Sequence, residues 1–243
     1  MAAYKNVGCG KRCFIMGNGP SLNKVDPLLL QQEVTFGVNA IYLAQDRLGF
    51  LPTYYVVEDR LVVADRGAEI ARMRGPTKFY SPIYNAQIPP DPQTVNLRVL
   101  YDYTQYADFP CFSRDAAQGV WCGGTVTYLC LQLAYYMGFD PVYLVGIDHN
   151  YVKPSDVVTQ GNVWTSTSDD PNHFHPDYFG KGKKWHDPLV ERMELSYRRA
   201  RAEFEAVGRN VFNATVGGKL EVFERRALAE IDGPSASPEP EAA

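Results

Sequence analysis

The stretch Cys13-Phe14-Ile15-Met16-Gly17-Asn18-Gly19-Pro20-Ser21-Leu22 decides how this chain is expected to fold. An apolar run ends in Gly-Asn-Gly-Pro-Ser before a helical pattern begins, which is the order of a β-strand, a tight turn and a helix N-terminus. Gly17 and Gly19 have no Cβ, so the backbone can turn sharply and a ligand can approach the main chain. Pro20 suits an early helical position, and Ser21 is expected as the N-cap. Free amides at such a helix start bind phosphate or carboxylate groups, although a plain strand-to-helix turn has the same pattern.

The composition limits the classes of protein to which the chain can belong. It has 243 residues, a formal net charge of −4 and a pI near 5.6. This length suits one α/β domain with a substantial core, and the acidic balance gives no electrostatic footprint for nucleic acid. We find no signal-peptide pattern and no apolar run long enough to span a bilayer, so we expect a cytoplasmic protein with at most peripheral membrane contact. The five cysteines lack C-x-x-C spacing, which argues against a disulfide framework or a zinc site.

Strand and helix patterns alternate along the rest of the chain. Expected strands cover 34–40, 53–59, 78–81, 95–101, 142–149 and 209–215, and expected helices cover 22–32, 41–48, 61–72, 125–137, 188–207 and 219–231. This alternation predicts an α/β, Rossmann-like fold, with a mostly parallel sheet and helices on both faces. We expect residues 1–12 as an N-terminal extension, 13–231 as a single α/β domain, and 232–243 as a disordered tail rich in Pro, Ser, Ala and Glu.

Polar residues stand at the carboxyl ends of three expected strands, where sheets of this kind bind ligands. Asn39 ends one of them, and its alternative role is to cap the next helix. Glu58 and Asp59 end another and are candidates for holding a ribose hydroxyl or a metal, whereas Asp59 alone would suit a helix cap. Asp148 ends the most apolar strand of the chain. The Gly123-Gly124-Thr125 start of the helix ending near residue 137 is a second candidate anion site.

The segment 150–184 follows no period and is predicted to form a long lid or binding loop. Its many aromatic residues argue against disorder, because disordered segments are poor in aromatics. All four histidines of the chain lie between Asp148 and Asp187. A neutral imidazole titrates near working pH and can take a proton from a hydroxyl group, so this segment holds the candidate bases.

Four motifs in this order carry a resemblance to known families: Gly17-Asn18-Gly19-Pro20-Ser21-Leu22, Val38-Asn39-Ala40-Ile41-Tyr42, Gly146-Ile147-Asp148-His149-Asn150-Tyr151 and Asn213-Ala214-Thr215. From Cys13 to about Phe223, the chain resembles the bacterial branch of the 6-hydroxymethylpterin diphosphokinase MptE-like family. More distantly, it resembles the small bacterial sialyltransferases of glycosyltransferase family 42. Those enzymes share the Gly-Asn-Gly-Pro-Ser-Leu turn, an Asn-x-x-Tyr/Phe after the second strand and a histidine ahead of the last long helix.

The resemblance implies a nucleotide-binding transferase domain and assigns roles to its residues. The implied nucleotide contacts are Gly17, Asn18, Gly19, Pro20, Ser21, Asn39, Gly123, Gly124, Thr125, Asp148 and Tyr178. Tyr151 matches the tyrosine that binds the leaving phosphate, and His186 matches the general base. His175 is a rival base, while His173 and His175 suit lid packing equally well. Lys181, Lys183 and Lys184 are candidates to assist, or form a solvated loop.

The two families imply different chemistry. The reading that we favour is a glycosyltransferase that moves a sialic-acid-like sugar from a CMP-activated donor to a glycan or surface-polysaccharide acceptor, without a metal cofactor. The alternative is Mg²⁺-dependent pyrophosphoryl transfer from ATP, for which Glu58, Asp59 and Asp148 would be the metal ligands. A third reading is a non-catalytic nucleotide-sugar-binding protein.

Overall fold

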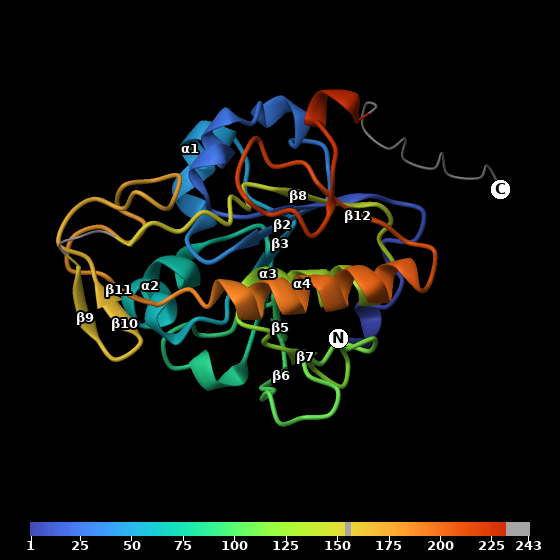
Figure 1. Ribbon diagram of the computed structural model, residues 1–243, viewed down its shortest axis with the longest axis horizontal. Coiled ribbons are helices and arrows are strands. Elements are labelled where there is room, and N and C mark those ends of the chain that lie inside the picture. Colours follow the sequence, from blue (N-terminus) through green and yellow to red (C-terminus); the bar gives the residue numbers. More distant parts are fainter. Residues whose placement is uncertain (154–156, 232–243) are drawn as a thin grey trace.

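Short runs of apolar, aromatic and β-branched residues form a parallel sheet, which confirms the expected α/β, Rossmann-like class (Figure 1). A computed structural model describes residues 1–153 and 157–231. Within these residues the sheet has eight strands in the order β13-β12-β8-β1-β2-β3-β4-β5, and each neighbouring pair is parallel. The strands are β1 (Cys13–Met16), β2 (Thr35–Val38), β3 (Tyr54–Val56), β4 (Thr77–Tyr80), β5 (Thr94–Asn96), β8 (Val142–Val145), β12 (Val211–Asn213) and β13 (Glu224–Arg225).

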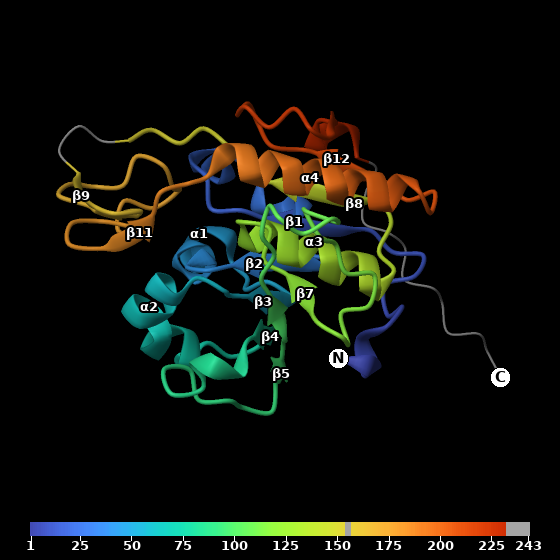
Figure 2. The same ribbon diagram turned by 60° about the horizontal axis from the view of Figure 1, so that its bottom comes forward.

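Helices cover both faces of this sheet, because alternate residues of each strand point to opposite faces. On one face, Cys13 and Ile15 of β1 pack in an apolar cluster with α3 (Val126–Met137) and α4 (Val190–Glu205). On the other face, Phe14 and Met16 share a cluster with residues of other helices. These include η2 (Pro20–Lys24), η4 (Ile41–Ala44), α1 (Gln45–Leu48) and α2 (Arg60–Arg72). Figure 2 shows α3 and α4 side by side, with α1 and α2 apart from them.

The strand order reverses direction between β1 and β8. The chain runs from β1 outward through β2, β3, β4 and β5, and then returns to place β8 on the other side of β1. In open α/β sheets, such a switch point opens a crevice at the carboxyl ends of the two strands. The crevice here is bordered by the turn after Met16 and the segment after Val145.

Two small sheets lie outside the main one. β9 (Val158–Gln160), β10 (Val163–Thr165) and β11 (Lys184–His186) form an antiparallel sheet beside α2 (Figures 1 and 2). β6 (Val99–Leu100) and β7 (Val120–Trp121) form a parallel pair. The segment 150–184 was expected as a loop without strands, and this is wrong for its described part. The buried indoles of Trp164 and Trp185 meet edge to face with centroids 4.7 Å apart, which holds β10 against β11.

Two expected helices are wrong. The stretch 22–32 forms only short 3₁₀ turns, η2 and η3 (Pro27–Leu29), because Pro27 lacks an N–H and holds the preceding Asp26 in an extended conformation. The stretch 219–231 contains β13 and the single turn η6 (Leu228–Glu230). Asn213 Nδ2 donates to the Leu220 carbonyl at 2.7 Å, and Glu224–Arg225 pairs with β12 instead of continuing a helix.

Two other boundaries differ from expectation, and one agrees with it. The strand expected at 95–101 is divided between β5 and β6, which belong to different sheets. The long helix α4 begins at Val190 rather than at Pro188, and α2 begins after Asp59, as expected for a cap. η5 (Pro82–Tyr84) follows β4.

The N-terminal segment is hydrogen-bonded to the last turn of α3. In the N-terminal segment 1–12, η1 (Ala2–Tyr4) precedes two amides that bind the last turn of α3: Asn6 N–H to the Tyr136 carbonyl and Gly8 N–H to the Met137 carbonyl. The predicted tail, 232–243, lies outside the described residues. No helix of the described part is both long and apolar enough to cross a bilayer.

We expect that Gln132→Leu will destabilise the protein. Gln132 is fully buried on α3; its Oε1 accepts from the amides of Ser113 and Trp121 at 2.9 Å, and its Nε2 donates to the Trp121 carbonyl at 2.8 Å. Each buried group left without a partner costs about 1–3 kcal/mol, so the melting temperature should fall by roughly 5 °C or more. Thermal unfolding measures this, with the exposed Gln32→Leu as the control. Equal melting temperatures for the two variants would contradict the prediction.

Candidate functional site

Three adjoining cavities form one groove along the carboxyl edge of the sheet. The inner cavity (about 100 Å³) is bordered by the turn after β1 and the segment after β8. The middle cavity (about 160 Å³) shares Asn39, Thr125, Tyr151 and Tyr178 with the inner one. The outer cavity (about 360 Å³) shares Glu58, Asp59, Gly124 and His186 with the middle one. The inner cavity therefore lies at the switch point, where this class of fold binds ligands.

Amides of the glycine turn after β1 are hydrogen-bonded to other groups of the protein. Gly17 N–H and Gly19 N–H donate to the carbonyls of Val145 and Gly146 at 2.8 and 2.9 Å. The Ser21 hydroxyl donates to Asp148 Oδ2 at 2.6 Å, and its amide donates to Asp148 Oδ1 at 3.2 Å. The expected free amides and the expected N-cap role of Ser21 are therefore wrong. The Asp148 carboxylate already occupies the position of an anion at this turn.

The turn glycines are needed for close packing. A Cβ on Gly17 would lie 2.3 Å from Ile147 Cδ1, and a Cβ on Gly19 would lie 1.9 Å from Asp148 Oδ2. Gly17, Asn18, Gly19 and Asp148 line the inner cavity, whereas Pro20 and Ser21 line none of the three cavities. The structure thus brings part of the expected nucleotide-binding turn to the groove and leaves its helical half outside.

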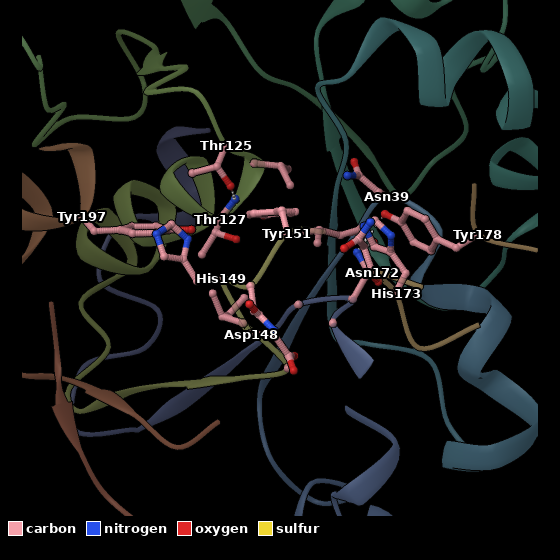
Figure 3. Close-up of a pocket in the computed structure, with 18 residues that line it drawn as sticks. Asn39, Thr125, Thr127, Asp148, His149, Tyr151, Asn172, His173, Tyr178 and Tyr197 are labelled. Atoms are coloured by element: carbon pink, nitrogen blue, oxygen red, sulfur yellow. Dashed lines mark hydrogen bonds between the residues drawn. The ribbon is translucent and has the colours of Figure 1, made fainter. Parts of the chain in front are cut away.

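Asn18, Asn39 and Tyr178 meet on one wall of the inner cavity (Figure 3). Asn18 Nδ2 donates to the Tyr178 hydroxyl at 3.0 Å and to the Val38 carbonyl at 3.1 Å. Asn39, at the end of β2, lines the same cavity. The alternative role of Asn39 as a helix cap is not seen, because η4 has no side-chain cap. The Asn18–Tyr178 contact thus joins two residues that are 160 positions apart in the sequence.

Two residues of this cavity hold a left-handed backbone conformation that is rare outside glycine. Asn39 has φ +51° at the end of β2, and His149 has φ +51° after β8. The Tyr55 hydroxyl donates to the Asn39 carbonyl at 2.6 Å, which helps to hold that conformation. Backbone strain of this kind concentrates at functional sites, so its position on both borders of the inner cavity supports a binding role.

The start of α3 forms the opposite wall of the groove (Figure 3). Gly123 and Gly124 have φ +57° and +81°, so this turn requires glycine. The Thr125 hydroxyl accepts from the Thr127 amide at 3.3 Å and caps the helix. Gly124 and Thr125 line the groove, while a Cβ on Gly123 would collide with the Tyr128 ring at 2.1 Å. Of the Gly-Gly-Thr sequence, only the last two residues therefore line the groove.

His186 is paired with Asp59 where the middle and outer cavities join. His186 Nδ1 lies 3.2 Å from Asp59 Oδ2, and Asp59 Oδ1 accepts from the Leu61 amide at 2.7 Å. Asp59 therefore caps α2 and also orients an imidazole carried by β11. Because Nδ1 is engaged, Nε2 is the ring nitrogen left to accept a proton, as in other carboxylate–histidine pairs.

The pair shifts the proton affinity of both partners. The hydrogen bond to the Asp59 carboxylate raises the pKa of His186, whereas burial acts in the opposite direction. Burial works to raise the pKa of Asp59, but the hydrogen bond and charge of His186 lower it overall. Next to them, burial raises the pKa of Glu58, although the Tyr101 hydroxyl donates to its Oε1 at 3.0 Å. The outer cavity therefore places a histidine of raised basicity beside a half-buried carboxyl group.

The other histidines have different surroundings. His175 accepts from the Asp177 amide in a local turn and lines none of the three cavities, so the structure does not bring this rival base to the groove. His173 lines the inner and middle cavities, stacks on Tyr178 with centroids 4.0 Å apart, and binds Asp170 through Nδ1 at 2.7 Å. Lys181, Lys183 and Lys184 also line none of them.

The carboxylates expected for a metal do not fit as one ligand set. Both oxygens of Asp59 and both oxygens of Asp148 already accept hydrogen bonds within the protein. Asp148 lies at the inner cavity, whereas Glu58 and Asp59 lie at the middle and outer ones. Within residues 1–153 and 157–231, no group of three or more His, Cys, Asp or Glu side chains could hold a metal ion. The trio Glu58, Asp59 and Asp148 is therefore not assembled.

Sequence reasoning missed several residues of the groove. They are Thr127, His149, Asn172 and Tyr197 at the inner cavity and Arg60, Tyr101, Cys122 and Arg192 at the outer one. His149 follows Asp148 at a strand end, and this position was a signal in the sequence that could have identified it. Burial lowers the pKa of His149, and Glu194 Oε1 lies 3.5 Å from its Nε2. Thr127 and Tyr197 lie on helices whose periodicity indicated only core packing. Tyr151 lines the inner and middle cavities, as expected.

The family model described as 6-hydroxymethylpterin diphosphokinase MptE-like matches residues 2–154. These residues run from η1 to just beyond β8 and include the glycine turn, Asn39, the Gly-Gly-Thr start of α3 and Asp148, but not His186. No curated protein matches the chain.

We predict that Gly19→Ala will unfold more easily than the unmodified protein, because its Cβ would overlap the Asp148 carboxylate. Overpacking of this kind costs about 1–3 kcal/mol. In an Asp148→Ala background the same change should cost less, because the two nearest clashing atoms are gone. Urea unfolding of the single and double variants tests this coupling. If the two changes add without coupling, the turn glycine does not serve the packing of β1 against β8.

Proposed function

This chain belongs to the 6-hydroxymethylpterin diphosphokinase MptE-like family, and from that premise we propose that it is a transferase acting on a nucleotide-activated donor. The acceptor is a hydroxyl group, and His186 is the general base. Within that class we propose transfer of a sugar from a CMP-activated donor to a glycan acceptor. The observation that carries the proposal is the pairing of His186 with Asp59 beside the groove at the switch point.

The pairing supports general-base catalysis because it fixes the imidazole and raises its basicity. Asp59 holds Nδ1, and the raised pKa favours uptake of a proton at Nε2. His186 reaches the groove from β11, whereas the candidate nucleotide contacts come from the turn after β1 and from the start of α3. In this arrangement the donor lies along the inner and middle cavities, and the acceptor enters through the outer one.

The charges in the groove favour a CMP-activated sugar over a triphosphate. Among the described residues, the inner and middle cavities have no lysine or arginine in their lining, and the outer one has Arg60 and Arg192. A triphosphate needs several cationic partners for its oxygens, and the carboxylates that would hold Mg²⁺ do not form a set. A phosphodiester with one charge needs fewer partners.

The proposed step is a substitution at the anomeric carbon. The acceptor oxygen forms a bond to that carbon as its proton passes to His186 Nε2. The bond from the carbon to the phosphate oxygen breaks, and its electron pair leaves with CMP. The Tyr151 hydroxyl and the Thr125 end of α3, which line the middle cavity, are positioned to stabilise the leaving phosphate.

The family match favours a second candidate function. Its description names a diphosphokinase, so pyrophosphoryl transfer from ATP to a hydroxymethyl group is the competing reaction. That reaction also needs an acceptor hydroxyl, and His186 would serve it equally. Binding of a nucleotide sugar without turnover would identify a non-catalytic binding protein instead.

We expect His186→Ala to lower turnover by about 10²–10⁴ with little change in donor affinity, because removing a general base costs that much. The assay is release of CMP from CMP-N-acetylneuraminate with water or oligosaccharides as acceptor. His175→Ala is the matched control, since His175 lies outside the groove. An active His186→Ala together with an inactive His175→Ala would overturn the assignment of the base.

Asp59→Asn should move the pH dependence of turnover. His186 must be neutral to accept a proton, so the rate rises with pH through its pKa, which Asp59 holds above the usual value of about 6.5. With asparagine the charge is lost and the rising limb should shift to lower pH, while the cap on α2 survives. A pH–rate profile whose rising limb does not move would contradict the pairing as a source of catalysis.

The donor class is tested by substrate choice with and without EDTA. We expect activity with CMP-N-acetylneuraminate to persist in EDTA and ATP with 6-hydroxymethylpterin to be inactive. The opposite pattern, with activity only on ATP and only with Mg²⁺, would move the function to the diphosphokinase reaction and leave the transferase class intact.

A further inference from the structure

The inner cavity contains two amide oxygens that have no hydrogen-bond donor. Asn18 Oδ1 and Asn39 Oδ1 are both buried, and both residues line this cavity. Asn18 is 8% exposed, so most of its side chain is out of contact with solvent. A buried acceptor without a donor costs about 1–3 kcal/mol. Two such atoms in one cavity indicate that a ligand supplies the missing donors.

The direction of the Asn18 amide is fixed by its partners. Its Nδ2 faces the Val38 carbonyl at 3.1 Å, and a carbonyl can only accept. The second N–H of Nδ2 donates to the Tyr178 hydroxyl at 3.0 Å. In a flipped amide, Oδ1 would face the Val38 carbonyl oxygen, and neither oxygen could donate to the other, so Oδ1 is the atom left for a ligand.

Asn39 is held through its backbone. Its left-handed conformation is fixed by its own N–H, which donates to the Val56 carbonyl at 3.2 Å, and by the Tyr55 hydroxyl, which donates to its carbonyl. Its side chain lies on the same wall of the cavity as Tyr178 (Figure 3).

A flat ring lies beside these oxygens. His173 stacks on Tyr178 with the ring planes 3° apart, and both residues line the inner cavity. Aromatic faces of this kind accept a planar heterocycle by stacking. An exocyclic amine on such a ring carries two N–H donors, which matches two acceptor oxygens.

We infer that the inner cavity binds the base of the nucleotide and selects bases that carry an exocyclic amine over bases that carry a carbonyl at the same position. This inference rests on the proposed function, which requires a nucleotide in the groove. A carbonyl would face the oxygens of Asn18 and Asn39 and leave them unpaired. The specificity determinants are the two amide oxygens.

The test compares nucleotides that differ in that group and in the proton on the ring nitrogen next to it. Calorimetric titration of the full chain should give about tenfold to a hundredfold tighter binding for CMP than for UMP, or for AMP than for IMP, because one mispaired buried group costs this much. Equal affinities within both pairs would overturn the inference and leave the proposed function standing. If none of the four nucleotides binds, both fail.

Variants locate the discrimination in the cavity. Asn39→Gly removes one of the two oxygens while keeping a residue that tolerates φ +51°, and it should reduce the affinity difference between the amine-bearing nucleotide and its carbonyl partner. Asn85→Ala is the matched control, because Asn85 Oδ1 is also buried without a donor but lines none of the three cavities. Retained discrimination in a folded Asn39→Gly protein, or its loss in Asn85→Ala, would overturn the role of Asn39. Circular dichroism checks the fold of each variant.

Discussion

The carboxylate of Asp148 joins the two strands on which the site depends. It accepts from the amide and hydroxyl of Ser21, so the turn after β1 is locked to the segment after β8. Gly17 and Gly19 allow this contact because any Cβ there would overlap Ile147 or Asp148. The switch point of the sheet lies between the same two strands, and the inner cavity opens there. Asp148, which was expected to contact the nucleotide, thus has a structural role at the edge of the site.

The rest of the groove is built by bringing distant segments onto this edge. Arg66 of α2, whose side chain is 7% exposed, donates from Nη2 to the Tyr178 carbonyl at 2.9 Å. Tyr178 in turn holds Asn18, and His173 stacks on it. Asp59 begins α2 and pairs with His186 of β11. One helix therefore positions both the wall of the inner cavity and the proposed base.

Predictions from local patterns were confirmed where the hydrogen-bonding partners of a segment lie close to it in the sequence. Most of the strands, the Asp59 cap, the end of α3 at Met137 and the parallel sheet follow from apolar runs, capping residues and alternation. Patterns failed where a distant partner replaced the local one. Ser21 looked like a cap but donates to Asp148, 127 positions away, and the stretch around residues 224–225 looked helical but pairs with β12. The small sheet of β9, β10 and β11 was missed because its pairing depends on tryptophans brought together by tertiary packing.

The sequence by itself determined the fold class and the family, and it predicted the carboxyl edge of the sheet as the place of the site, because the alternation of strands with helices and the glycine-rich turns are local patterns. It also placed the histidines in one segment without deciding among them. Only the tertiary structure decided that His186 meets Asp59 while His175 stays in a local turn, and that the three expected metal carboxylates are not assembled. The reason is physical: proton affinity, pairing and burial depend on neighbours that are far away in the chain and close in space.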